Sequence, residues 1–151
     1  MNTLVTGGAG FIGTNLVKRL LADGHSVTVV DNFSTGLLEN KQSGCKYYNQ
    51  DIVTVDNYSA YGDFDVVFHL AAIARIQPSF EDPKRYFRTN AMGTFKLAQW
   101  ASHYDIPVIY AGSSSKHSGR FKNPYTFSKD IGEDAIELFK THYNLKATTK
   151  V

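Results

Sequence analysis

The feature that most constrains the fold is a glycine-rich turn close to the start of the chain. It reads Thr6-Gly7-Gly8-Ala9-Gly10-Phe11-Ile12-Gly13 and follows a short β-branched run at 3–6. Gly7 permits a tight turn after a strand, Gly10 lets the backbone approach a pyrophosphate, and Gly13 lets a helix pack closely on a sheet. Free N–H groups and the dipole of that helix favour phosphate charge. The turn, spaced GxxGxxG, therefore predicts a dinucleotide-binding unit.

A carboxylate stands where such a unit needs one. Asp31 follows the run at 26–30, which is mostly β-branched and predicts a strand buried on both faces. A carboxylate at this strand end accepts hydrogen bonds from the adenosine ribose and repels a 2′-phosphate, which favours NAD over NADP. The alternative is a structural glycine turn followed by an Asp that caps a loop. The order of strand, turn, helix, strand and acid favours NAD.

The rest of the chain alternates between predicted strands and predicted helices. Strands are predicted at 3–6, 26–30, 45–48, 65–70 and 107–111, with the opening of a sixth at 145–151, and helices at 11–22, about 82–103 and 124–143. Strands separated by helices of this length predict a parallel sheet with right-handed crossovers. The sequence therefore predicts a Rossmann-type, doubly wound, three-layer α/β fold. The 151 residues suit one such domain.

Composition narrows the classes of function. The formal net charge is +2 and the basic residues are scattered, which gives no electrostatic reason to expect nucleic acid or a membrane surface as partner. No apolar stretch approaches the roughly 20 residues that span a bilayer, and the first strand leaves no room for a signal peptide. Cys45 is the only cysteine, so we expect a structural thiol and no metal site. We expect a cytoplasmic protein.

A second constellation lies at the start of the last predicted helix. Tyr125-Thr126-Phe127-Ser128-Lys129 has the pattern YxxxK, whose spacing puts the phenol and the ammonium on one helical face. A phenol is a poor base at neutral pH unless a nearby Lys⁺ and an oxidised nicotinamide favour its phenolate. Taken alone, such a pair is more often a surface pair.

A serine run, Ser113-Ser114-Ser115, comes directly after the predicted fifth strand. A hydroxyl there could hydrogen-bond the substrate oxygen whose proton Tyr125 removes, although a polar turn after a strand is the simpler alternative. The glycine turn, the acid, the serine run and YxxxK in this order are more specific than any one of them.

Together these segments resemble the N-terminal half of the extended short-chain dehydrogenases/reductases. Within that superfamily the similarity is to the NAD-dependent epimerase/dehydratase family of nucleotide-sugar enzymes, UDP-glucose 4-epimerase-like proteins in particular. The matching segments are Thr6 to Gly13, Asp31 to Gly36, Asp51-Ile52, Val67 to Ala72, Asn90 to Thr94, the serine run and Tyr125 to Lys129.

The resemblance implies roles for particular residues. The catalytic residues would be Tyr125 as base, Lys129, and Ser113 or Ser114. The residues that would bind NAD are Gly7, Gly10, Phe11, Ile12, Gly13, Asp31, Asn32, Asp51, Ile52, Ala71, Ala72, Ala74, Asn90 and Lys129. Among them, Asp31 and Asn32 would hold the adenosine ribose, Asp51 and Ile52 would flank the adenine, and the alanines would lie beside the nicotinamide half. His69 is interpreted as a core histidine at a strand end rather than as a ligand or base.

The implied reaction is hydride transfer at a sugar hydroxyl carbon. Tyr125 would remove the hydroxyl proton to give a 4-keto sugar, and return of the hydride to the opposite face would complete an epimerisation. Members of this family continue for roughly as long again, and that C-terminal remainder supplies most contacts to the nucleotide sugar. We therefore expect an epimerase or dehydratase if the missing half is supplied. The alternatives are a truncated NAD-binding module without independent turnover, and one half of a split enzyme.

One departure from the family pattern leaves the catalytic serine open. The segment before Tyr125 is short, and the usual Val-Tyr-Gly reads His117-Ser118-Gly119. Alignment on the strand selects Ser113, whereas alignment on Gly119 selects Ser114; the strand alignment is favoured.

The resemblance also implies a homodimer, in which the helices at 82–103 and 124–143 pair two subunits into a four-helix bundle. An open sheet edge at the sixth strand is a second reason to associate. The apolar surface of the bundle would come from Tyr86, Phe95, Trp100, Ile136 and Phe139, unless these residues pack on the sheet instead.

Overall fold

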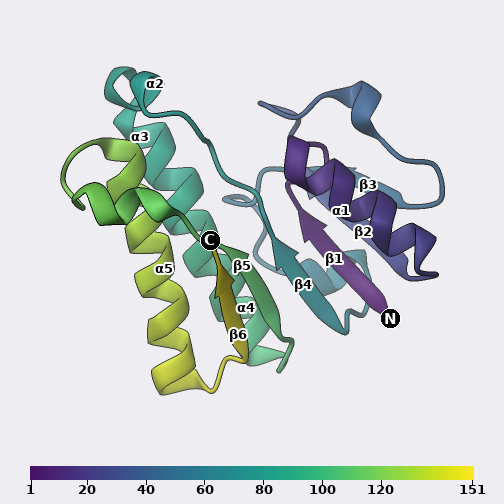
Figure 1. Cartoon of the computed structure of the whole chain (residues 1–151). Helices are drawn as coiled ribbons and strands as arrows, with labels where there is room; N and C mark the ends of the chain where they lie inside the picture. The colour runs from purple at the N-terminus through teal and green to yellow at the C-terminus, as the bar shows by residue number, and fades with distance from the viewer.

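A computed structural model describes all 151 residues and confirms the parallel α/β fold. One sheet runs in the order β3-β2-β1-β4-β5-β6, and every neighbouring pair of strands is parallel (Figure 1). The strands are β1 (Asn2–Thr6), β2 (Ser26–Asp31), β3 (Lys46–Asn49), β4 (Val66–His69), β5 (Val108–Ala111) and β6 (Ala147–Lys150).

Two of the three predicted helices have the predicted bounds. The helices are α1 (Phe11–Ala22), α2 (Gln77–Glu81), α3 (Pro83–Tyr86), the π-helix η3 (Phe87–Gly93), α4 (Thr94–His103) and α5 (Pro124–Tyr143). Short 3₁₀ turns complete the chain at η1 (Leu38–Asn40), η2 (Tyr58–Tyr61) and η4 (Ser114–Ser118). The predicted helix at 82–103 is thus three consecutive segments with a π-helical middle, and α2 was not predicted.

Local chemistry explains why α5 begins and ends where it does. The side chain of Asn123 accepts a hydrogen bond from the Thr126 N–H at 2.7 Å, and Pro124 occupies the first turn, where its missing N–H costs nothing. At the other end, Asn144 adopts a left-handed conformation with φ of 57°, which stops the helix. The sequence carries both signals.

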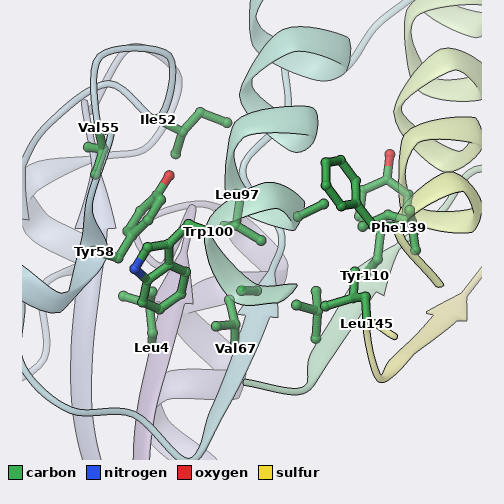
Figure 2. Close-up of a cluster of buried hydrophobic side chains, with 14 of the residues drawn as sticks. Leu4, Ile52, Val55, Tyr58, Val67, Leu97, Trp100, Tyr110, Phe139 and Leu145 are labelled. Atoms are coloured by element: carbon green, nitrogen blue, oxygen red, sulfur yellow. The ribbon is translucent and has the colours of Figure 1, made fainter. Parts of the chain in front are cut away.

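The sheet separates two layers of helix, as predicted. Successive residues of β1 alternate between them: Val5 packs with Val17 and Leu20 of α1 on one face, and Leu4 packs under α4 and α5 on the other. Figure 2 shows the larger cluster, in which the aromatic rings of Tyr58 and Trp100 lie beside Leu4.

The sequence left open whether the apolar residues of the two long helices pack on the sheet or face outward towards a second subunit. The larger cluster answers this question. Trp100, Ile136 and Phe139 are buried members of this core, and Tyr86 is also buried. Phe95 is partly buried and packs edge-on against Phe139, with ring centroids 5.1 Å apart. These residues therefore pack within the subunit and do not form its free apolar surface.

The functional segments converge on one edge of the sheet. The chain leaves β1 towards β2 on one side and leaves β4 towards β5 on the other, although β1 and β4 are neighbours. In open α/β sheets, ligands bind outside the carboxyl ends of the strands at such a switch point. The glycine turn follows β1 and the segment beginning at Leu70 follows β4, so both lie at this point.

Candidate functional site

The glycine turn is built so closely that side chains cannot enter it at two positions. Gly7 has a φ of +74°, and a Cβ there would lie 2.7 Å from the backbone nitrogen of Ala71 beyond β4. A Cβ on Gly13 would lie 2.1 Å from the carbonyl oxygen of Gly7. The turn can therefore hold α1 this close to β4 only with glycine at both positions.

The first turn of α1 offers backbone donors to the cavity beside it. Gly10 is the N-cap residue, no side chain caps the helix, and the cavity is lined by Gly10, Phe11 and Ile12. Phe11 and Ile12 are 86% and 65% exposed, so the helix terminus lies at the surface of the cleft. Uncapped N–H groups and the positive end of a helix dipole suit the negative charge of a diphosphate.

Asp31 lies at the end of β2 and connects two loops. Its Oδ2 accepts a hydrogen bond from the Ala9 N–H at 2.9 Å, and its Oδ1 accepts one from the Phe33 N–H at 2.8 Å. The side chain also lines a cavity with Asn32, so the carboxylate retains acceptor capacity towards that cavity. The loop-capping role and the ligand-facing role, which the sequence presented as alternatives, are compatible in this geometry.

Two adjoining cavities bring together most of the predicted site residues. The smaller cavity lies over the ends of β1, β2 and β4 and includes Gly7, Gly10, Asp31, Asn32, Asp51, Ile52, Ala71 and Ala72. The larger cavity, of about 830 Å³, includes Gly7, Gly10, Phe11, Ile12, Gly13, Ala72, Ala74, Tyr125 and Lys129. The glycine turn and Ala72 belong to both cavities, so the two form one continuous cleft from the end of β2 to the start of α5.

Asn90 is the predicted cofactor residue that lines neither cavity. It is buried in the π-helix, where its side chain donates to the Ile73 carbonyl at 3.0 Å and accepts from the Ile73 N–H at 2.8 Å. It also donates to the Ser128 hydroxyl at 3.0 Å. Its amide thus holds the loop after β4 against α5, and it acts on the cleft through that loop.

The structure brings one of the two candidate serines to the tyrosine. The Ser113 Oγ lies 3.4 Å from the Tyr125 Oη and 2.8 Å from the Ser115 Oγ. Ser114 lies in η4 with its side chain exposed and has no side-chain hydrogen bond. The ring of Tyr86 packs edge-on against that of Tyr125, with centroids 6.4 Å apart. The geometry therefore favours Ser113, the serine that alignment on the strand selects.

Lys129 is held under the same cavity. Its ammonium donates to the Ala111 carbonyl at 2.7 Å and lies 4.4 Å from the centroid of the Tyr110 ring. Burial lowers the pKa of Lys129 to about 8, and the negative charge of Glu133 one turn later opposes that decrease. The ammonium is therefore fixed and charged at neutral pH. Lys129 follows Tyr125 by about one turn of α5, so the two residues share one face of the helix.

His69 is a core histidine, as predicted. Its Nδ1 lies 2.6 Å from the Thr6 Oγ1, its Nε2 lies 2.9 Å from the Thr94 Oγ1, and its ring stacks on Tyr110. Burial, together with the nearby charge of Lys129, lowers its pKa to about 3. The ring is therefore neutral and fully hydrogen-bonded within the fold.

Ion pairs that the sequence analysis missed hold the short segment before Tyr125 against α5. The Lys116 Nζ lies 2.6 Å from the Glu133 Oε1, and the Arg120 Nε lies 3.0 Å from the Asp130 Oδ2. Arg120 also pairs with Asp134. The three acids at 130, 133 and 134 share one side of the helix, and this spacing was the available signal. Pairs this exposed stabilise weakly, so they orient the segment more than they stabilise the fold.

Three further observations concern features that the sequence singled out. The Cys45 thiol is half-buried, donates to the Gln42 carbonyl at 3.4 Å, and has its pKa raised by burial. The structure holds no group of three His, Cys, Asp or Glu side chains arranged to bind a metal ion. None of its helices combines the length and apolar character needed to cross a membrane.

Comparison with known proteins agrees with this geometry. The family model described as the NAD dependent epimerase/dehydratase family matches residues 3–150. The chain is 35% identical to UDP-glucose 4-epimerase of Mycolicibacterium smegmatis, over 96% of this chain and 53% of that protein. It is 31% identical to a putative UDP-glucose 4-epimerase of Methanocaldococcus jannaschii, over 95% of this chain and 52% of that protein.

Solved structures give the same result. UDP-glucose 4-epimerase of Thermotoga maritima with UDP-glucose superposes with a TM-score of 0.92 and 32% identity, over 99% of this chain and 54% of that one. UDP-glucose 4-epimerase of Thermus thermophilus in complex with NAD gives a TM-score of 0.88 and 30% identity, over 99% and 54%. The chain therefore spans about half the length of the relatives that it matches.

Proposed function

The chain belongs to the NAD dependent epimerase/dehydratase family, and we propose that it binds NAD along its cleft and acts on a nucleotide sugar. The observation that carries the proposal is the meeting of two distant segments. Tyr125 and Lys129 line the same cavity as the glycine turn, more than a hundred positions earlier in the chain.

NAD fits the residues of the cleft. The close-packed glycine turn and the uncapped amides of α1 suit its diphosphate, and the Asp31 carboxylate suits the two hydroxyls of its adenosine ribose. The same carboxylate would repel the 2′-phosphate of NADP, so we infer that NAD is preferred. Asp51 and Ile52 line the smaller cavity, where the adenine would lie.

The hydroxyl cluster supports proton transfer by Tyr125. A substrate hydroxyl in the larger cavity would hydrogen-bond both the Ser113 Oγ and the Tyr125 Oη, which are already within 3.4 Å of each other. Tyr125 would take the proton of that hydroxyl. When bound, NAD supplies the acceptor for the hydride that leaves the same carbon.

Lys129 would make that proton transfer easier. Its ammonium is buried, so its charge is screened less than a surface charge. The hydrogen bond to the Ala111 carbonyl fixes where that charge lies, in the cavity that Tyr125 also lines. Lys129 would therefore contribute a positive charge held at a fixed place in the cavity.

A nucleotide sugar is the proposed substrate because relatives named as UDP-glucose 4-epimerases share both the fold and the sequence pattern. A second candidate, NAD binding without turnover by this chain alone, is motivated by relatives of about twice its length. One half of a split enzyme would behave in the same way until its partner is added.

A homodimer through the outer faces of η3, α4 and α5 is part of the proposal. The apolar side chains that face outward there differ from those that the sequence suggested. Met92 and Leu138 are 45% and 43% exposed, and Phe127 and Ile131 are half-buried on the same face of α5 as Leu138. A stripe at this helical spacing suits packing against a second copy of the two helices.

Thermal unfolding with NAD, followed by an assay for turnover, tests the proposal. Ligand at one hundred times Kd should stabilise the folded chain by about 2.7 kcal/mol. Tyr125→Phe should retain this stabilisation, and its effect on turnover should separate the two candidates. Ser113→Ala should lower turnover far more than the matched Ser114→Ala. No stabilisation by NAD at millimolar concentration would overturn the proposed function.

A further inference from the structure

Two arginines that the sequence analysis did not single out line the larger cavity. Arg75 lies in the loop after β4 and Arg85 lies in α3, and both line the cavity that contains Tyr125. All the ion pairs of the structure involve other cations, so neither guanidinium has a carboxylate partner within 4.0 Å. Two unpaired guanidinium groups at a cavity wall are free to bind an anion.

The backbone that carries Arg75 is fixed in an uncommon conformation. Its φ is +83°, a region that L-residues rarely adopt, so the surrounding structure must hold it there. Hydrogen bonds immediately before it do so. Asn90 pairs with both backbone groups of Ile73, and the Tyr86 hydroxyl donates to the Ala74 carbonyl at 2.9 Å. The direction in which Arg75 leaves the loop is therefore built into the fold.

Both arginines line the same cavity as Tyr86 and Tyr125. Burial raises the pKa of Tyr86, the charges of Arg85 and Arg75 act against that rise, and the charge of Glu81 adds to it. The Tyr86 ring is the one that packs edge-on against Tyr125. An anion held by Arg75 and Arg85 would thus lie near the group that would remove the substrate proton.

The cavity also contains other charged side chains. Glu81 and Asp82 line it as well, and Lys129 lies beneath it. The Asp82 Oδ1 accepts a hydrogen bond from the Arg85 backbone N–H at 3.0 Å, so this carboxylate caps α3. Glu81 is exposed and forms no ion pair. With Lys129 counted, three cations and two carboxylates line the cavity, which leaves one net positive charge.

We propose that Arg75 and Arg85 bind an anionic oxygen group of the nucleotide-sugar substrate beside Tyr125. The group is a carboxylate on the sugar or a phosphate attached to it. This inference rests on the proposed function. The cofactor diphosphate is already provided for by the glycine turn and the amides of α1, so the arginines are available to the substrate. A planar guanidinium matches a carboxylate or phosphate through two parallel hydrogen bonds.

Nuclear magnetic resonance on the ¹⁵N-labelled chain saturated with NAD tests the inference. The arginine Nε–H signals are followed during titration with UDP-glucuronate and, separately, with UDP-glucose. The variants are Arg75→Gly, which suits the positive φ, and Arg85→Ala. Arg88→Ala is the matched control, because Arg88 is also an exposed cation of the same helical region but does not line the larger cavity.

If the arginines bind the phosphate, both nucleotide sugars should shift the signals of Arg75 and Arg85. If they bind the sugar carboxylate, UDP-glucuronate alone should shift them. Loss of either arginine should weaken binding by about tenfold to a hundredfold, with no change in Arg88→Ala. Weakening confined to UDP-glucuronate identifies a sugar carboxylate, and equal weakening for both ligands identifies the phosphate.

Two results would overturn the inference. In one, millimolar nucleotide sugar shifts neither arginine signal, or both variants bind as the Arg88→Ala control does. In the other, the variants lose affinity for NAD instead, which would assign the arginines to the cofactor. Thermal unfolding with NAD is measured on every variant beforehand, so failure of the proposed function is recognised independently.

Discussion

At the scale of single residues, Asp31 combines a structural and a ligand-facing role. Its two oxygens accept from the Ala9 and Phe33 N–H groups, which join the glycine turn to the turn after β2. Because the carboxylate also lines the smaller cavity, its charge would act on whatever occupies the ribose position. Replacing Asp31 by asparagine removes the charge and keeps the size of the side chain, so the effect of the charge can be measured by itself.

Asp31→Asn should weaken NAD binding by about tenfold, because a neutral amide is a poorer acceptor for ribose hydroxyls. It should also narrow the preference for NAD over NADP, since the repulsion of a 2′-phosphate is removed. Dissociation constants for both cofactors check this, with Glu39→Gln as the charge-matched control on an exposed 3₁₀ turn. An unchanged ratio of the two constants would show that Asp31 acts only on the loops.

His69 makes stability depend on pH. The unfolded chain binds a proton there near pH 6.5, whereas burial keeps the folded chain neutral down to about pH 3. The unfolded state therefore binds more protons in this window, and the free energy of unfolding should fall as pH decreases through it. At pH 5 the loss should be about 2 kcal/mol.

Urea unfolding at pH 7.5 and pH 5 measures this dependence. His69→Asn should be less stable at both pH values, because Asn cannot span the hydroxyls of Thr6 and Thr94. Its stability should nevertheless change less between them than that of the unmodified chain. Equal changes in the two proteins would contradict the assignment to His69.

The choice between the two candidate serines shows what reasoning from single residues could not decide. Ser113 and Ser114 are chemically identical and adjacent, and two alignments of the sequence favoured different ones. The choice depends on where β5 ends relative to α5. Ser113 caps η4 with its hydroxyl 3.4 Å from the Tyr125 hydroxyl, whereas Ser114 turns outward.

At the scale of elements, the π-helix and α5 form the wall behind the cleft. A Cβ on Gly132 would lie 2.5 Å from the Asn90 carbonyl oxygen and 2.9 Å from the Tyr110 hydroxyl oxygen. The two helices therefore approach so closely that only glycine fits at their crossing. This approach lets Asn90 reach both Ser128 on α5 and the loop after β4.

Gly132→Ala should therefore destabilise the fold by about 1–3 kcal/mol through overpacking, although alanine is the better helix former. Denaturant unfolding measures the effect. His142→Ala, at an exposed position of the same helix, is the control and should change stability by less than about 0.5 kcal/mol. A stabilised Gly132→Ala variant would show that the helices can separate without cost.

Long elements with clear periodicity were predicted within one or two residues. The bounds of α1 and α5 were predicted, because glycine, proline and asparagine mark their ends and apolar residues repeat at helical spacing. The five-residue helix α2 is too short for such a repeat. The π-helix packs closely against Gly132 of α5, and such a contact between distant segments is not visible in a local pattern.

At the scale of the whole molecule, the proposed dimer depends on the apolar stripe on α5. Leu138→Asp should shift the chain from dimer to monomer, because a charge would have to be buried in the bundle. Leu38→Asp is the matched control, since Leu38 is an exposed leucine on η1, away from both helices. Light scattering with size-exclusion chromatography measures the mass. A monomeric unmodified chain at high concentration would contradict the proposed dimer.

The sequence by itself determined the parallel fold and the glycine turn, and it predicted Asp31, Tyr125 and Lys129 as candidate site residues. These follow from properties of a few consecutive residues: a positive φ, the space that only glycine leaves, strand alternation and helical spacing. Tertiary structure alone decided which serine meets Tyr125 and which aromatic residues belong to the core. It also placed Arg75 and Arg85 at the same cavity. Those outcomes depend on where separate elements meet, and no local pattern encodes that distance.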